Sequence, residues 1–397
     1  MFNKKLLNYL QCPVCSGQYK FYNIGNTEKI YENSGILTCS KCGRSIIVIS
    51  GIPIFHKYFD NSSAAFDFLL RIIKGDESTV PFLSSILRRS VNSVKFDKLL
   101  RYLHHEKLSR IFELFQTDYI NLKRFSSKKY FKIHRFLTDK PIELLLDIGC
   151  GFGCSTVPFI TSGKAKYCIG LDSSLFFLLL FKKYCKESKL QNVGLILLDA
   201  KNTPYPFRSY LFDVVLGVGF FNHFISSKSR QLLYLFFREL TRITKKWGRV
   251  YLDCVPNRLY PFPGEVNTPN LLERRSLEKT ARILLSFTPF KWLSGSFSVK
   301  TLWLLYKVYC RLARIPAESY DVFLDHISGV IPEANVNFLP LLPSHYEEML
   351  SGFAEVTVMP QNKFYNSKFY ENFLSKRWRI RDFLKSPYLI LYAKNRR

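Results

Sequence analysis

The sequence predicts an α/β protein with a doubly wound, mainly parallel sheet, a small cysteine-bearing unit before it and a helical insertion within it. One observation is the apolar run at 144–148, which contains Asp147 and leads directly into the glycine-rich loop 149–153. A second is that two further apolar runs, 167–172 and 193–200, also place an acidic residue at or near their ends. Long apolar runs that end in polar loops are typical of parallel strands covered on both faces.

The glycine loop follows the first predicted strand. Gly149, Gly151 and Gly153 alternate with larger residues, so the backbone can turn sharply and approach a ligand closely. Residues 154–161 can begin a helix, whose free N–H groups would favour a carboxylate or a phosphate. The loop departs from the dinucleotide-binding fingerprint, because Cys154 stands where that motif has its third glycine. A tight strand-to-helix turn without a ligand is the alternative interpretation.

The acids that follow the next two strands are candidates for ligand contacts. Asp172 suits the hydroxyl groups of a ribose, and Asp199 with Ala200 closes the following strand. Each carboxylate could instead cap a helix or form a turn. Three acids at the ends of three successive strands nevertheless favour one shared site. A fourth strand is expected at 212–219, and a helix followed by a fifth strand at 238–253.

In this order the segments resemble the class I S-adenosylmethionine (SAM) methyltransferases, in particular their small-molecule, ubiquinone-biosynthesis-like branch. The motifs that carry the resemblance are the glycine loop, the ribose acid, Asp-Ala at 199–200, Pro-Tyr-Pro-Phe at 204–207, Phe-Asp at 212–213 and Phe-Phe-Asn-His-Phe at 220–224. One departure is Lys-Lys-Trp-Gly at 245–248, where a Pro-Gly-Gly turn is usual. The resemblance implies a Rossmann-like, seven-stranded sheet whose final strand is antiparallel.

The resemblance also implies roles for individual residues. The three glycines of the loop would hold the methionine part of SAM, with Asp147 near its amine. Asp172 would bond the ribose diol, and Asp199 with Ala200 would flank adenine. His223 is the candidate catalytic residue, because it stands at a family position beside the methyl group, where it could act as a general base or shape the pocket.

The N-terminal segment, residues 1–55, contains two Cys-x-x-Cys pairs, Cys12 with Cys15 and Cys39 with Cys42. Four thiolates form a closed tetrahedral zinc site without an open position for catalysis. A redox dithiol is the alternative, but two such pairs in a short segment favour zinc. The segment also resembles a small zinc-ribbon family whose stand-alone members activate tRNA, rRNA and translation-factor methyltransferases. That resemblance implies a structural or docking module.

The expected organisation of the chain has four parts. A zinc-ribbon domain occupies 1–55 and a helical segment 56–127. The SAM-binding domain occupies 128–255 and is completed by 341–397. Between these two pieces, 256–340 is expected to be an aromatic, helical insertion, with a substrate cap, an interfacial membrane helix and a plain helical core as the three interpretations.

Net charge and the lengths of the apolar runs limit the cellular locations and binding partners that we expect. The net charge of +27 suggests an acidic partner such as RNA or an anionic membrane surface, although lysines that only keep the protein soluble would give the same total. The apolar run 175–181 is far too short to span a bilayer, and the N-terminus lacks a signal-peptide core. We therefore expect a cytoplasmic protein, with peripheral membrane contact left open and with cysteines present as thiols or metal ligands.

These features together favour methyl transfer to a small-molecule acceptor, which can be lipid- or glycan-linked. The fourth strand is not followed by Asn-Pro-Pro-Tyr, which argues against methylation of an exocyclic base amine. An RNA methyltransferase that docks through its zinc ribbon and basic surface is the first alternative. A catalytically inactive, methyltransferase-like binding partner is the second.

Overall fold

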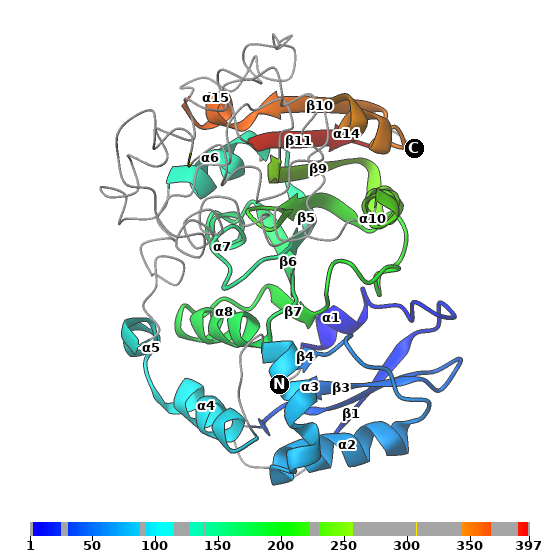
Figure 1. Cartoon of the computed structure of the whole chain (residues 1–397), viewed down its shortest axis with the longest axis vertical. Helices are drawn as coiled ribbons and strands as arrows, with labels where there is room; N and C mark the ends of the chain where they lie inside the picture. Colours follow the sequence, from blue (N-terminus) through cyan, green and yellow to red (C-terminus); the bar gives the residue numbers. More distant parts are fainter. Residues whose placement is uncertain are drawn as a thin grey trace.

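The structure is a computed structural model, which describes residues 3–24, 31–87, 93–114, 128–137, 140–221, 230–256, 307, 343–366 and 388–395. Its main sheet has seven strands, with helices on both faces (Figure 1). In spatial order the strands are β10 (Glu355–Pro360), β11 (Tyr388–Lys394), β9 (Thr244–Pro256), β8 (Phe212–Gly217), β5 (Ile142–Ile148), β6 (Ala165–Asp172) and β7 (Val193–Leu197).

The directions of these strands confirm the predicted doubly wound sheet. β9, β8, β5, β6 and β7 run parallel, whereas β11 lies antiparallel between β9 and β10. The chain leaves the central strand β5 towards β6 on one side and later returns to β8 on its other side. The carboxyl end of β5 is therefore a topological switch point, where α/β sheets bind their ligands.

Alternation along β5 explains why both faces of the sheet are covered. Leu145 packs into one hydrophobic core, whereas Leu144 and Leu146 pack into the other. One core includes side chains of α6 (Lys128–Leu137), α7 (Val157–Thr161) and α8 (Leu175–Glu187), and the other those of α10 (Arg230–Ile243) and α14 (Pro343–Met349). The apolar run at the start of α8 is buried, as predicted. α15 (Gln361–Asn366) directly follows β10.

Two local expectations about helix and turn need correction. The helix after the glycine loop is only the five-residue α7, because residues 151–156 form turns before it. Lys-Lys-Trp-Gly at 245–248 does not form a turn between the helix and the fifth strand but lies inside β9, where the pairing with β8 shifts register. Trp247 adopts a φ of +64° there, so a local backbone irregularity takes the place of the turn.

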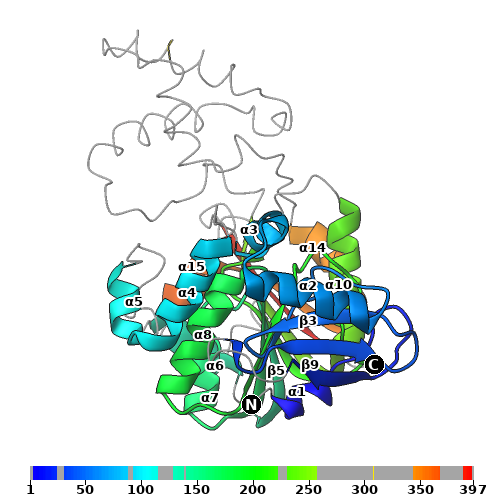
Figure 2. The same cartoon turned by 90° about the horizontal axis from the view of Figure 1, so that it is seen from below.

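The N-terminal residues form a second, four-stranded antiparallel sheet in the order β1 (Tyr19–Asn23), β2 (Gly35–Cys39), β3 (Ser45–Ile49) and β4 (Ile52–Pro53), preceded by α1 (Lys4–Leu7). This N-terminal unit lies beside β7, at one edge of the main sheet (Figures 1 and 2). Ile54 forms a parallel bridge with Leu197, in which the Phe55 N–H donates to the Leu197 carbonyl at 2.8 Å. The unit thereby covers an edge strand that would otherwise expose its hydrogen-bonding groups.

Within the segment 56–127, residues 56–61 are non-helical and Phe59 bridges to Ser45 of β3, whereas the described residues from 62 onward are mainly helical. Its elements are α2 (Ser62–Lys74), the 3₁₀ turn η2 (Glu77–Thr79), α3 (Val80–Leu87), α4 (Ser93–His105) and α5 (Leu108–Leu114). α4 ends at His105 and α5 begins at Leu108, whose N–H donates to the Glu187 carboxylate of α8 at 3.0 Å. Residues 257–306 and 308–342, nearly all of the predicted insertion, lie outside the described residues. None of the described helices has the length and apolarity needed to cross a membrane.

Candidate active site and cysteine cluster

The three glycines of the loop all have positive φ, but their surroundings differ. The φ values are +69° at Gly149, +54° at Gly151 and +94° at Gly153. A Cβ at Gly149 would collide with Phe220, and one at Gly153 would collide with Phe181. A Cβ at Gly151 would meet nothing within 4 Å. Two of the glycines are therefore required by packing, and only Gly151 faces open space.

That open space is a pocket between the loop, the start of α6 and the end of β8. The loop supplies one wall, α6 supplies Lys129 and Tyr130, and the residues after β8 supply Val218 and Gly219. The remaining lining residues are Gly149, Cys150, Gly151, Phe152, Cys154 and Ser155. The pocket thus lies at the switch point of the sheet, where the sequence predicted a ligand.

Asp147 lies beneath the loop and is fully buried. Its Oδ2 accepts hydrogen bonds from the hydroxyls of Ser155 and Thr156, both at 2.6 Å. Its Oδ1 has no hydrogen-bond partner among the described residues. The pKa of Asp147 is raised from 3.8 to about 6, mainly by burial and to a smaller extent by Asp172 and Asp253, against the lowering effect of the two hydroxyl donors. An orphaned buried oxygen here fits a site that a polar or cationic ligand completes.

Asp172 connects the end of β6 to the glycine loop. Its Oδ2 accepts from the Gly151 N–H at 2.9 Å, and its Oδ1 accepts from the Ser174 N–H at 2.8 Å. The carboxylate therefore helps to fix the loop and remains partly exposed.

Asp199 and Ala200 follow β7, one strand further along the carboxyl edge of the sheet. The Asp199 carboxylate accepts from the Lys201 N–H at 3.0 Å, and the Ala200 carbonyl accepts from the Tyr205 hydroxyl at 2.8 Å. Neither residue is among those that line the pocket at Gly151. His223, the predicted catalytic residue, lies outside the described residues, as does Asn222.

A buried ion pair beside the pocket was not predicted from the sequence. Asp253 of β9 is fully buried, and the Lys129 ammonium lies 2.9 Å from its Oδ2. The Gly219 N–H donates to Oδ1 at 2.7 Å, and the Tyr365 hydroxyl donates to Oδ2. Burial acts to lower the pKa of Lys129, but the Asp253 carboxylate outweighs it and leaves that pKa above its ordinary value. The sequence offered only one signal for this pair, the acid near the end of the predicted fifth strand.

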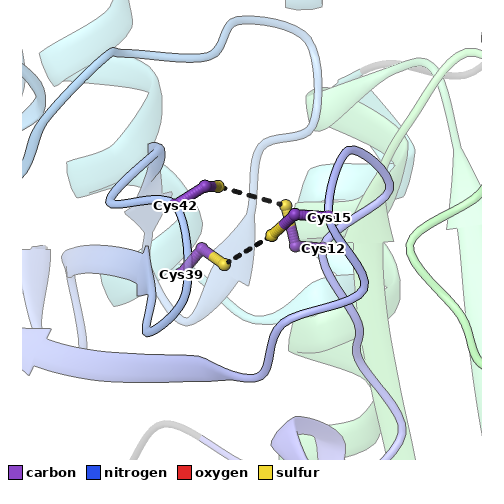
Figure 3. A group of neighbouring side chains, drawn as sticks. All are labelled: Cys12, Cys15, Cys39 and Cys42. Atoms are coloured by element: carbon purple, nitrogen blue, oxygen red, sulfur yellow. Dashed lines mark hydrogen bonds between the residues drawn. The ribbon is translucent and has the colours of Figure 1, made fainter.

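The four N-terminal cysteines meet in one cluster (Figure 3). All their Sγ atoms lie within 4.8 Å of one another, with 3.8 Å between Cys12 and Cys42 and 3.4 Å between Cys15 and Cys39. A tetrahedron of sulfurs about 2.3 Å from a zinc ion has edges of roughly 3.8 Å. The Lys41 N–H donates to the Cys39 sulfur at 3.4 Å, as expected around thiolates. The donor set and its spacing fit a structural zinc ion.

Comparison with known proteins supports the interpretation of the main sheet. The family described as "Methyltransferase domain" matches residues 146–252. The mouse (Mus musculus) protein named "Probable tRNA methyltransferase 9B" is 27% identical over 129 residues, which are 32% of this chain. This chain spans 25% of the length of that relative.

Similar solved structures include a SAM-dependent methyltransferase from Mesorhizobium loti (13% identity, 68% of this chain, 100% of that chain, TM-score 0.38). Another is the Haemonchus contortus phosphoethanolamine N-methyltransferase 2 with phosphomonomethylethanolamine and S-adenosylhomocysteine (15% identity, 73% of this chain, 57% of that chain, TM-score 0.38). A third is a complex between the Haloferax volcanii Trm112 methyltransferase activator and a methyltransferase (11% identity, 68% of this chain, 90% of that chain, TM-score 0.35).

The antiparallel β11 between β9 and β10 is the arrangement that the sequence resemblance implied. Residues 146–252, which run from the end of β5 into β9, are the part of the chain that matches the methyltransferase domain family.

Proposed function

We propose that this protein transfers a methyl group from SAM to a small-molecule acceptor, which can be lipid- or glycan-linked. The observation that carries the cofactor assignment is the open pocket at Gly151, where a glycine with φ of +54° leaves its Cα side free for a ligand. The buried Oδ1 of Asp147, which has no partner within the described part of the chain, and the charged Lys129 beside the same loop suit a ligand that carries both an ammonium and a carboxylate.

The order of the strands supports the proposed division of the cofactor site. Because β5, β6 and β7 are neighbours, Asp147, Asp172 and Asp199 follow one another along the carboxyl edge of the sheet. In this proposal Gly149, Gly151 and Gly153 shape the cradle for the methionine part. Asp172 binds the ribose diol, and Asp199 with Ala200 flanks the adenine.

Bound SAM supplies a methyl group on a sulfonium, whose departing thioether is neutral. The chain therefore has to position an acceptor in line with that methyl group, and positioning of this kind is worth on the order of 7–11 kcal/mol. Val218 and Gly219, which follow β8, line the pocket, and the Gly219 N–H donates to Asp253 of β9. His223 follows β8 in the sequence and stays our candidate for shaping this side or accepting a proton from the acceptor.

The class of acceptor rests on the sequence after β8. The segment 220–224 resembles the small-molecule branch of the SAM methyltransferases and lacks the Asn-Pro-Pro-Tyr signature of enzymes that methylate exocyclic base amines. RNA is the second candidate acceptor, favoured by the name of the mouse relative and by the net charge of +27. The N-terminal unit would then serve as a docking element for RNA as well as a cover for β7.

We also propose that Cys12, Cys15, Cys39 and Cys42 hold one zinc ion. All four positions of a tetrahedron would be filled by thiolates, so this ion would stabilise the N-terminal unit and take no part in methyl transfer.

Labelled methyl transfer into a cell extract tests the acceptor. The extract is incubated with methyl-labelled SAM and the protein, then separated into RNA, lipid or glycan, and small-molecule fractions, with the Gly151→Val variant as control. We expect label outside the RNA fraction, dependent on Gly151 and little affected by salt. Label in RNA that is lost between about 50 and 200 mM salt would overturn the small-molecule assignment and favour RNA.

A further inference from the structure

The charges around the pocket are unbalanced among the described residues. Asp147, Asp172 and Asp253 are close enough that the last two raise the pKa of the first. Lys129 is the single basic side chain that lines the pocket within the described part of the chain. If the proposed function holds, this pocket must receive an amino-acid group whose carboxylate would lie near these acids, and Lys129 is the basic side chain in its lining that can offset them.

Asp253 holds Lys129 in place without occupying all the hydrogen-bond donors of its ammonium. Asp253 has no exposed side-chain surface, whereas the Lys129 side chain keeps 30% exposure while lining the pocket. The carboxylate of Asp253 also accepts from the Gly219 N–H and from the Tyr365 hydroxyl. One proton of the ammonium suffices for the ion pair, and the Cys254 sulfur at 3.9 Å is a weak acceptor. The ammonium therefore has hydrogen-bonding capacity left on its exposed side.

We infer that Lys129 binds the carboxylate of the methionine part of SAM, and that Asp253 and Tyr365 position it. The inference rests on the proposed function and assigns to Lys129 a binding role for the cofactor. A fixed ammonium meets a carboxylate without a cost of reorganisation, because its partners already hold it beside Gly219. The remaining acids then face the cationic parts of the ligand.

The competing explanation is that Lys129 only neutralises Asp253. In that case Lys129→Met would leave an unpaired buried charge and disturb the pocket indirectly. The double variant Lys129→Met/Asp253→Asn removes both charges and separates the two explanations. Lys132→Met is the control on the same helix, since the Lys132 ammonium donates to the Tyr365 carbonyl and does not line the pocket.

Calorimetric binding of SAM and of decarboxylated SAM, which lacks only the carboxylate, tests the inference without measuring activity. We expect the wild type, Lys132→Met and Lys129→Arg to prefer SAM over the decarboxylated analogue by about 10-fold or more. In Lys129→Met and in the double variant this preference should disappear, with little loss of affinity for the analogue.

Two results would overturn the inference while leaving the proposed function intact. One is a wild-type protein that binds SAM but shows no preference over the analogue, and the other is a preference that persists in the double variant. A wild-type protein that binds neither compound would instead reject the proposed function, and the inference with it.

Discussion

At the scale of single residues, chemically identical side chains serve different purposes within one loop. Gly149 and Gly153 are required because Phe220 and Phe181 occupy the space of a side chain, whereas Gly151 faces the pocket. The acids differ in the same way. Asp172 holds the loop through the Gly151 N–H, while Asp147 is buried and one of its oxygens has no partner among the residues that the structure describes. Spacing in the sequence does not reveal these differences.

Gly151→Ala should weaken SAM binding by about 10-fold or more, because its Cβ would enter the pocket. Gly163→Ala is a matched control, since Gly163 has φ of +69°, has nothing within 4 Å of an added Cβ and lies at an exposed turn. Both variants should lose about 1–2 kcal/mol of unfolding free energy from left-handed strain. Urea unfolding and calorimetry measure the two effects, and equal SAM affinities in the two variants would count against the pocket assignment.

Asp147→Asn should remove a pH dependence of stability. In the folded state the pKa of Asp147 is raised from 3.8 to about 6, so the folded protein binds this proton more tightly than the unfolded chain. Its contribution to stability is therefore present below pH 3.8 and declines by about 3 kcal/mol as the pH rises to 6, after which it is constant. We expect urea unfolding to show that the wild type loses more unfolding free energy than Asp147→Asn when the pH is raised from 4.5 to 7. Parallel profiles for the two proteins would contradict a raised pKa.

At the scale of elements, sites form where several chain segments end together. The pocket combines the loop after β5, the start of α6 and the end of β8. The cysteine cluster combines the loop after α1 with the end of β2 and the turn after it. Gly17 belongs to this second arrangement, because a Cβ there would lie 2.6 Å from the Cys39 sulfur.

Cys39→Ser should release the proposed zinc ion, since three thiolates and a hydroxyl bind zinc more weakly than four thiolates. Elemental analysis should find about one zinc per chain in the wild type and much less in the variant, together with faster amide exchange at 35–49. Cys185→Ala changes a buried thiol of α8 outside the cluster and should retain the metal. Full metal retention in Cys39→Ser would reject the assignment.

At the scale of the whole molecule, the N-terminal unit and the main sheet share a hydrophobic core. Leu6, Leu10 and Cys12 pack in the same cluster as side chains of β5–β9. Bridges join Ile54 to Leu197 and Leu10 to Phe207, so hydrogen bonds as well as apolar contacts cross the junction. We therefore expect the two parts to unfold together.

Leu6→Ala tests this coupling. Leu6 is fully buried, and a Cβ added at Gly194 of β7 would lie only 2.9 Å from the Leu6 Cδ1. The Leu6 side chain therefore packs directly against β7. The variant should lose about 2–5 kcal/mol of unfolding free energy in a single transition, with faster amide exchange at 193–197. Lys4→Ala, at an exposed position of the same helix, should change neither measurement. Two separate transitions, with β7 unaffected, would show that the parts fold independently.

The sequence by itself determined those features that short patterns encode. The strands between 144 and 253, the glycine loop and the grouping of the four cysteines were predicted from such patterns, because burial, turn geometry and ligand spacing depend on neighbouring residues. The seven-stranded sheet with an antiparallel last strand was implied by the family resemblance, and the structure confirms it. The roles of Asp172 and Asp199 in binding SAM stay predictions, as does that of His223.

The tertiary structure alone decided which distant residues meet. Lys129 and Asp253 approach to 2.9 Å because α6 begins beside the end of β9, and Tyr365 reaches the same carboxylate from α15. No local pattern pairs these residues, since the contact depends on how the sheet is ordered and how helices cover it. The same reason applies to the junction of Ile54 with Leu197, where an N-terminal segment covers the edge of β7 that lies opposite its pairing with β6.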